Sequence, residues 1–232
     1  MTFADIPIGG KIETEAFRTF VKLTEDGLCC SEIAADMCFS TKEGSGDEVW
    51  KNNGCNIYHF SEINQRIRET DTDYVKGYDG AINSRAWKMN NLEGVEEHFV
   101  AKDIVTYTTE RNVKSNFAFC YIDKVYGWLP STEDIKESWW KTYVKEYPIN
   151  GFWNYPLLFR EGKGRSEVFY YNSKDGKIKT GPAYVERRVR PLYQIKTDTE
   201  MVEKTNGKYL IVYTASHDVS IDDSEFKSFL TL

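Results

Sequence analysis

The chain has 232 residues, of which 41% are hydrophobic and 15% aromatic, so it can bury a sizeable core and is not a disordered chain. Its formal net charge of -6 opposes binding to phosphate backbones and anionic lipids, so no nucleic-acid partner is expected. It has no run of about 18 apolar residues and no export signal at its start. We therefore expect no membrane insertion and a cytoplasmic location at synthesis.

The cysteines are odd in number and include no Cys-x-x-Cys pair. This spacing favours free, buried thiols over a zinc site or a disulfide framework. Adjacent Cys29 and Cys30 would point to opposite faces if they lie in a strand. The five are Cys29, Cys30, Cys38, Cys55 and Cys120.

The first half of the chain predicts short elements separated by loops. Two apolar runs, 20–23 and 28–31, flank Asp26-Gly27 and predict a β-hairpin. Ser61 precedes apolar residues four apart and predicts a capped helix of about two turns. Residues 71–91 lose all periodicity and predict a long loop, which carries the aromatic residues Tyr74, Tyr78 and Trp87.

The middle of the chain predicts a short helix at 92–99, a strand at 104–109 and a buried strand at 117–129. Ser131 then begins a helix with acidic residues in its first turn, and Pro148 ends it. Its large apolar residues recur every four positions and therefore form one stripe along the helix. Such a stripe favours a face packed on the core over a ligand site. The stripe consists of Ile135, Trp139, Tyr143 and Tyr147.

The last third predicts an antiparallel meander with strands at 167–171, 178–180 and 189–195. Asn206-Gly207 is the strongest hairpin signal and precedes a predicted strand at 208–213. The densest basic stretch includes Arg187, Arg188 and Arg190. We interpret it as a solvated strand edge, because Glu186 and Val189 interrupt the charge.

No motif indicates catalysis. His59, His98 and His217 are far apart and form no two-histidine helical motif, and no Gly-x-Ser-x-Gly elbow is present. The glycines around Arg165 lack the spacing of a phosphate-binding loop. We therefore expect no catalytic residue, no metal and no cofactor, and we predict that the chain is not an enzyme.

Aromatic residues instead gather around the predicted meander. Trp and Tyr combine a large contact area with a polar group, which suits recognition of proteins or sugars. The alternative is that several of them belong to the core. They are Trp153, Tyr155, Tyr170 and Tyr171.

The order of several segments resembles that of a family of uncharacterised bacterial and phage proteins with a C-type-lectin-like C-terminal region. The segments are 20–23, Asp47-Glu-Val-Trp50, 54–63, the junction from Val125 through Pro130 to Asp134, and Phe169-Tyr-Tyr-Asn172 continuing to Arg188-Val-Arg-Pro191. The resemblance implies an α+β, C-type-lectin-like fold with short helices, antiparallel strands and long loops. It covers residues 1–196 as one domain and leaves 197–232 as a C-terminal extension, a hairpin plus an acidic tail, packed on that domain.

In such lectin-like proteins a strand, a turn and a closing Val-Arg-Pro strand display the residues that contact ligand. By resemblance, the ligand-binding residues here are Trp153, Asn154, Tyr155, Tyr170, Asn172 and Lys179. The Glu-Pro-Asn and Trp-Asn-Asp triplets of calcium-dependent sugar binding are absent, so no calcium site is carried over.

These features favour a non-catalytic binding module that recognises a protein or glycan. We expect it to be a phage or bacterial accessory protein, which could be associated with a virion. The alternative is a structural or assembly protein of a phage particle, in which the 209–213 strand packs on neighbouring subunits as a homo-oligomer. An enzyme on a lectin-like fold is the distant third hypothesis. It would need His98, Cys120 and a carboxylate in one cleft.

Overall fold

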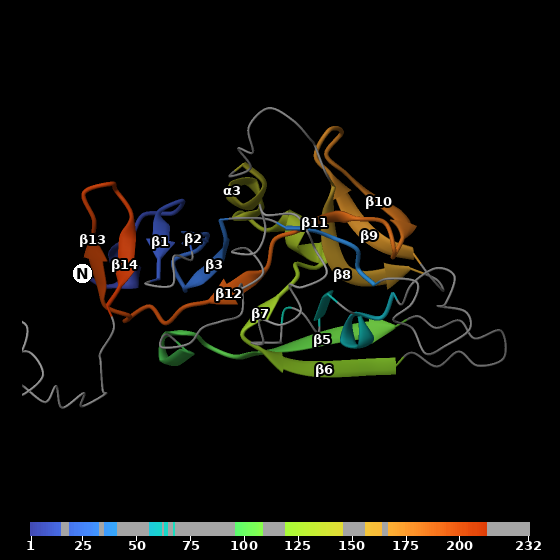
Figure 1. Cartoon of the computed structure of the whole chain (residues 1–232), viewed down its shortest axis with the longest axis horizontal. Coiled ribbons are helices and arrows are strands. Elements are labelled where there is room, and N and C mark those ends of the chain that lie inside the picture. The colour runs from blue at the N-terminus through green and yellow to red at the C-terminus, as the bar shows by residue number, and fades with distance from the viewer. Residues whose placement is uncertain are drawn as a thin grey trace, which may run out of the picture.

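β-Sheets dominate the protein, and helices are few and short (Figure 1). The computed structural model describes residues 1–14, 19–32, 35–40, 56–61, 63–64, 67, 96–108, 119–145, 156–163 and 167–212. The secondary structure of these residues agrees with an α+β or mostly-β fold. The C-type-lectin-like topology and the domain boundary at residue 196 stay predictions.

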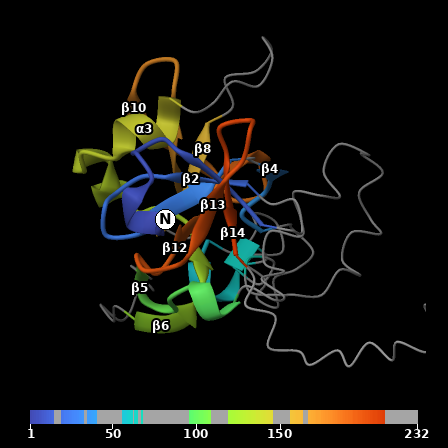
Figure 2. The ribbon, with the colours of Figure 1, turned by 90° about the vertical axis from the view of Figure 1, so that its left-hand side faces the viewer.

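A seven-stranded sheet joins the beginning of the chain to residues near its end. Its order is β13-β14-β1-β2-β3-β12-β7. Figures 1 and 2 show the N-terminus beside the β13–β14 hairpin. The strands are β1 (Lys11–Glu13), β2 (Thr19–Lys22), β3 (Leu28–Ser31), β7 (Gly127–Trp128), β12 (Leu192–Gln194), β13 (Met201–Glu203) and β14 (Tyr209–Ile211).

Two hairpins predicted from turn residues lie in this sheet. β2 and β3 pair antiparallel around Asp26-Gly27, with Val21 opposite Cys30. β13 and β14 pair antiparallel around Asn206-Gly207. β14 also pairs with β1, so its backbone is used on both sides and a neighbouring subunit would meet only its side chains.

Cys29 and Cys30 point to opposite faces of β3, as the sequence predicts. Cys30 belongs to the core cluster that also contains Leu129 and Tyr143, whereas Cys29 belongs to a second cluster with Phe3. Cys29, Cys30 and Cys38 form no disulfide bond with a described residue. Burial raises the pKa of the Cys29 thiol well above its usual value, which makes it unreactive at neutral pH.

A five-stranded sheet has the order β10-β9-β8-β11-β4. Its strands are β4 (Ala35–Met37), β8 (Leu157–Lys163), β9 (Glu167–Asn172), β10 (Lys177–Pro182) and β11 (Arg187–Val189). The predicted β9–β10 hairpin is confirmed, but the third strand of the predicted meander is wrong. β11 pairs with β8 and β4, and the chain then passes through Pro191 into β12 of the other sheet. Proline has no N–H to continue a ladder.

The strands β5 (Lys102–Thr108) and β6 (Phe119–Val125) pair with each other and lie along one side of both larger sheets (Figure 1). β5 confirms the strand predicted at 104–109. β6 is not buried throughout as predicted, because Ile122 is 64% exposed while Asp123 is 3% exposed. A two-stranded sheet with one face on the core alternates in this way.

The helix predicted after Ser131 is broken in two. A 3₁₀ helix, η6 (Thr132–Lys136), begins where expected, and the Ser131 N–H donates to the Asp134 carboxylate at 2.6 Å. Glu137 is extended, and α3 (Trp140–Lys145) follows. Trp139 and Trp140, at the start of α3, are both buried.

The other short helices are 3₁₀ turns at η1 (Phe3–Asp5), η2 (Tyr58–Phe60) and η5 (Glu96–His98). η5 lies within the helix predicted at 92–99. After η2, the Asn64 N–H donates to the Ser61 hydroxyl at 3.2 Å, which agrees with Ser61 as a helix cap. None of the described helices has the length and apolar composition that crossing a bilayer requires.

The basic stretch of β11 is buried, so the prediction of a solvated strand edge is wrong. Arg187, Arg188 and Arg190 are 4%, 5% and 0% exposed. Backbone carbonyls compensate the desolvation: Arg187 donates to Pro182 at 2.8 Å, and Arg190 donates to Ser31 at 2.6 Å. Ser31 is 159 residues from Arg190, so no local sequence pattern encodes this partner.

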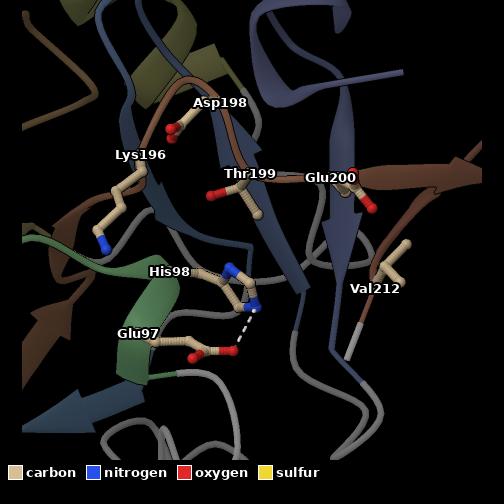
Figure 3. Close-up of a pocket in the computed structure, with 7 residues that line it drawn as sticks. All are labelled: Glu97, His98, Lys196, Asp198, Thr199, Glu200 and Val212. Carbon is tan, nitrogen blue, oxygen red and sulfur yellow. Dashed lines mark ion pairs between the residues drawn. The ribbon is translucent and has the colours of Figure 1, made fainter. Parts of the chain in front are cut away.

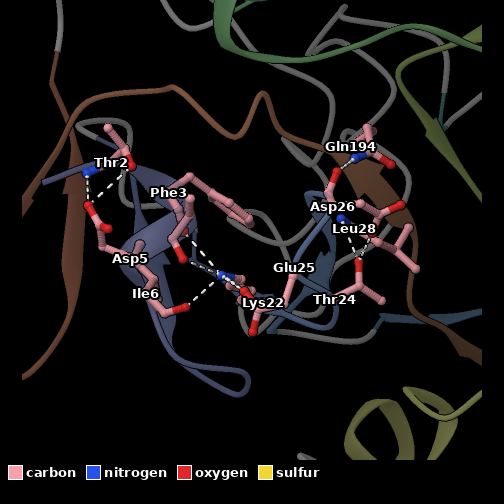
Figure 4. Close-up of polar contacts among 11 residues, drawn as sticks. Thr2, Phe3, Asp5, Ile6, Lys22, Thr24, Glu25, Asp26, Leu28 and Gln194 are labelled. Carbon is pink, nitrogen blue, oxygen red and sulfur yellow. Dashed lines mark hydrogen bonds and ion pairs between the residues drawn. The ribbon is translucent and has the colours of Figure 1, made fainter.

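A buried lysine holds the N-terminal 3₁₀ turn. The ammonium of Lys22 is fully buried and donates to the carbonyls of Phe3, Ala4 and Ile6 at 3.2, 3.0 and 2.6 Å (Figure 4). It also pairs with Glu25 at 2.7 Å. The Phe3 carbonyl also accepts from the Ile6 N–H at 3.2 Å, and Lys22 adds a charged donor to it and to the next carbonyls, which ties η1 to β2.

Candidate functional site

Half of the predicted ligand-binding residues can be located. Tyr170 and Asn172 lie on β9 and Lys179 on β10. Trp153, Asn154 and Tyr155 lie outside the described residues, as do Tyr74, Tyr78 and Trp87 of the predicted loop and His217.

The three located residues share one face of the β9–β10 hairpin. Tyr170 lies directly opposite Lys179, and Asn172 lies opposite Lys177. Directly opposed residues point to the same side of a sheet, as do residues two apart in one strand. We call the set Tyr170, Asn172, Lys177 and Lys179 the hairpin face. β10 is the outermost strand of the five-stranded sheet, so this face lies at the edge of the sheet.

The ring of Tyr170 is backed by an arginine. The guanidinium of Arg187 lies 4.5 Å from the ring centroid and donates to the carbonyls of Pro182 and Val185. A side chain at Gly181 would place a Cβ 2.5 Å from this guanidinium, so glycine makes room for the stack. Burial lowers the pKa of the arginine from its usual value.

Hydrogen bonds fix the turn that joins the two strands. The Lys174 N–H donates to the Asn172 side-chain oxygen at 3.0 Å, and the Lys177 N–H donates to the Asp175 carboxylate at 3.2 Å. Lys179 pairs with Asp175 at 2.6 Å, and its hydrogen bond holds the pKa of Asp175 below the usual value. The hairpin face is therefore pre-organised.

The opposite side of the hairpin packs on the core. Tyr171 meets Trp140 edge to face at 5.3 Å, and Phe169 and Ile178 pack on the same cluster. The sequence alone left open whether Tyr170 or Tyr171 is displayed. The register places Tyr170 and Tyr171 on opposite faces of the hairpin, with Tyr170 on the hairpin face; both are half-buried, and both pack against this cluster.

A histidine–aspartate pair links η2 to β6 and was not found from the sequence. His59 Nδ1 lies 2.9 Å from Asp123 Oδ1, and the amide of Asn64 donates to Asp123 Oδ2 at 3.4 Å. A buried carboxylate of this kind orients an imidazole. Catalysis would further require a nucleophile at the other ring nitrogen. The partners are 64 residues apart, so no local motif signals them.

His98 lies apart from this pair, on η5. Its Nε2 is 3.5 Å from a carboxylate oxygen of Glu97, and both residues line a pocket. The side chain of Cys120 lies outside the described part of the chain, so the cleft of His98, Cys120 and a carboxylate stays a prediction. In the described part of the chain, no three His, Cys, Asp or Glu side chains are grouped to hold a metal ion.

No family model, no curated protein and no solved structure matches this chain. The similarity to uncharacterised bacterial and phage proteins therefore stays a prediction from the order of motifs. Function has to be inferred from the geometry of the chain itself.

Proposed function

We propose that the chain is a non-catalytic binding module that recognises a protein or glycan partner through the hairpin face. The supporting observation is that Tyr170, Asn172 and Lys179, separated in sequence, share one pre-organised face at a sheet edge. Rigid side chains lose little entropy on binding, so a fixed turn favours recognition.

The chemistry of the hairpin face favours an acidic partner. Lys179 lies opposite Tyr170, Lys177 lies opposite Asn172, and the buried Arg187 stacks on the Tyr170 ring. The carboxylate of Asp175 pairs with Lys179. This gives a locally positive surface on a chain of net charge -6. A tyrosine ring beside ammonium groups suits a sugar ring that carries carboxylate or sulfate groups, or an acidic peptide.

A role as a phage or bacterial accessory protein, with virion association, is part of the same proposal. Its support is the order of motifs described above, together with the hairpin face. Fold-level similarity carries less weight than the chemistry of a site.

The proposal is tested with the full chain on a glycan array and by affinity capture with acidic peptides. Lys179→Gln should weaken binding of the captured partner about tenfold, as expected for loss of one charge-assisted hydrogen bond. Lys174→Gln makes the same charge change in the exposed turn and should leave binding unchanged. Equal binding by wild type and Lys179→Gln would refute the role of this face.

A second candidate is an assembly protein. β10 and β13 are the outer strands of their sheets among the described strands, and outer strands can pair with a second copy. Light scattering separates the two hypotheses. A mass that rises with protein concentration favours assembly, and a constant monomer mass opposes it.

A further inference from the structure

A small pocket lies between η5 and the turn that leads from β12 to β13 (Figure 3). Its volume is about 250 Å³, and its polar lining consists of Glu97, His98, Lys196, Asp198, Thr199 and Glu200. Figure 3 shows the side chains of His98 and Thr199 pointing toward the same space.

Backbone hydrogen bonds build the pocket from four parts of the chain. The Lys196 N–H donates to the His98 carbonyl at 2.9 Å, which holds η5 against the end of β12. The Phe3 N–H donates to the Thr199 carbonyl at 2.8 Å, and the Val212 N–H donates to the Glu200 carbonyl at 3.1 Å. The lining residues are therefore held by fixed backbone.

Two buried polar atoms at this pocket lack a hydrogen-bond partner among the described residues. They are Thr199 Oγ1, on a residue that is 4% exposed, and His98 Nε2. The Glu97 carboxylate lies within ion-pair distance of Nε2 but without hydrogen-bond geometry. Buried polar atoms are nearly always hydrogen-bonded, so the two atoms point to a bound molecule.

The charges around the pocket favour a cation. The lining includes three carboxylates and only one ammonium group, that of Lys196. The carboxylates are those of Glu97, Asp198 and Glu200. Asp198 and Glu200 are exposed, and their carboxylates form no hydrogen bond or ion pair with another described residue. A bound ammonium group would find carboxylate acceptors that no protein cation already occupies.

We infer that this pocket binds a small organic cation that carries both an ammonium and a hydroxyl group, such as an amino alcohol or an amino sugar. A hydroxyl both donates and accepts, so it satisfies Thr199 Oγ1 and either tautomer of His98. A volume of about 250 Å³ is enough for a ligand of roughly the size of a monosaccharide.

The inference goes beyond the proposed function. The pocket is lined by η5 and by residues next to β13 and β14 of the seven-stranded sheet, whereas the hairpin face belongs to the five-stranded sheet. Either can therefore fail while the other holds.

Isothermal titration calorimetry of the full chain tests the inference with four probes: ethanolamine, glucosamine, N-acetylglucosamine and glucose. Glucosamine and ethanolamine should bind saturably at pH 7, and the two uncharged sugars should bind at least about tenfold more weakly. Tighter binding of glucosamine than ethanolamine would identify the amino sugar, and the reverse would identify the amino alcohol. Absence of saturable binding of both amines, or equal binding of glucosamine and glucose, would overturn the inference.

Matched variants place the binding in this pocket. Asp198→Asn removes one exposed carboxylate, and Thr199→Val removes the buried hydroxyl with little change in shape. Each should weaken amine binding about tenfold. Glu203→Gln, an equal charge change on exposed β13 away from the lining, should have no effect. Full amine binding by Asp198→Asn would overturn the inference even if Thr199→Val does not fold.

Discussion

Tyr143 and Arg190 exchange hydrogen bonds with each other's backbone. The Tyr143 hydroxyl donates to the Arg190 carbonyl at 2.8 Å, and the Arg190 guanidinium donates to the Tyr143 carbonyl. The guanidinium also lies 5.4 Å from the Tyr143 ring centroid and donates to Ser31. This one arginine therefore joins α3, the end of β3 and the passage between the two larger sheets.

Arg190→Met should lower the free energy of unfolding by about 3 kcal/mol or more, because it leaves two buried carbonyls without their donor. Urea denaturation measures this change. Lys174→Met, an exposed cation in the β9–β10 turn, is the control and should change stability by less than about 0.5 kcal/mol. If both variants unfold at the same urea concentration, Arg190 does not hold the sheets together.

Lys22→Met should destabilise the protein by about 2 to 3 kcal/mol, because three carbonyls near η1 lose a charged donor. Lys124→Met tests the same replacement at an exposed position of β6. Hydrogen exchange should further show faster exchange in residues 3–6 of Lys22→Met alone. Unchanged exchange there would contradict the role of Lys22 in holding η1.

Gly27→Ala and Gly207→Ala form a matched pair, since both glycines have positive φ angles, of 103° and 74°. A Cβ at Gly27 would lie 2.1 Å from the Ile195 carbonyl oxygen, whereas a Cβ at Gly207 meets nothing within 4 Å. We expect Gly207→Ala to cost about 1 kcal/mol from backbone strain alone. Gly27→Ala should cost about 3 kcal/mol or more, because the clash adds to the strain. Equal thermal shifts would contradict the close contact at Gly27.

Acid should weaken the connection between β1 and the β13–β14 hairpin. Hydrogen bonds from Lys208 and Lys204 hold the pKa of Glu13 below its usual 4.5. A carboxylate with a lowered folded-state pKa stabilises the fold above its unfolded pKa, and this contribution is lost as the pH falls through the folded value.

Glu13→Gln should therefore be less stable than wild type at pH 7, and the difference should shrink below pH 4.5 and disappear as the pH falls through the lowered folded-state pKa of Glu13. Denaturation at a series of pH values measures it. Glu203→Gln, on β13 of the same sheet, is the control for loss of a carboxylate. A difference between wild type and Glu13→Gln that stays constant down to pH 3 would contradict the linkage.

Local signals predicted local structure well. Asp26-Gly27 and Asn206-Gly207 indicate their hairpins because turn residues determine backbone angles within a few positions. The hairpin face follows from the same logic once β9 and β10 are paired, since alternation places Tyr170 and Asn172 together.

Long-range partners could not be predicted. Arg190 looks like a surface residue until Ser31 and Tyr143, 159 and 47 residues away, supply its acceptors. Asp123 likewise lies inside a predicted buried strand, and only the fold brings His59 to it. Burial of a charge depends on such distant acceptors, which a single sequence does not display.

The most direct test of the proposed function compares wild type, Lys179→Gln and Lys174→Gln on one array of acidic and neutral glycans, followed by titration of any glycan or acidic peptide that binds. The account predicts saturable binding of an acidic partner by wild type and Lys174→Gln, and a loss of about tenfold for Lys179→Gln. Binding that is identical in all three proteins, or confined to neutral partners, would contradict the hairpin face as the recognition surface.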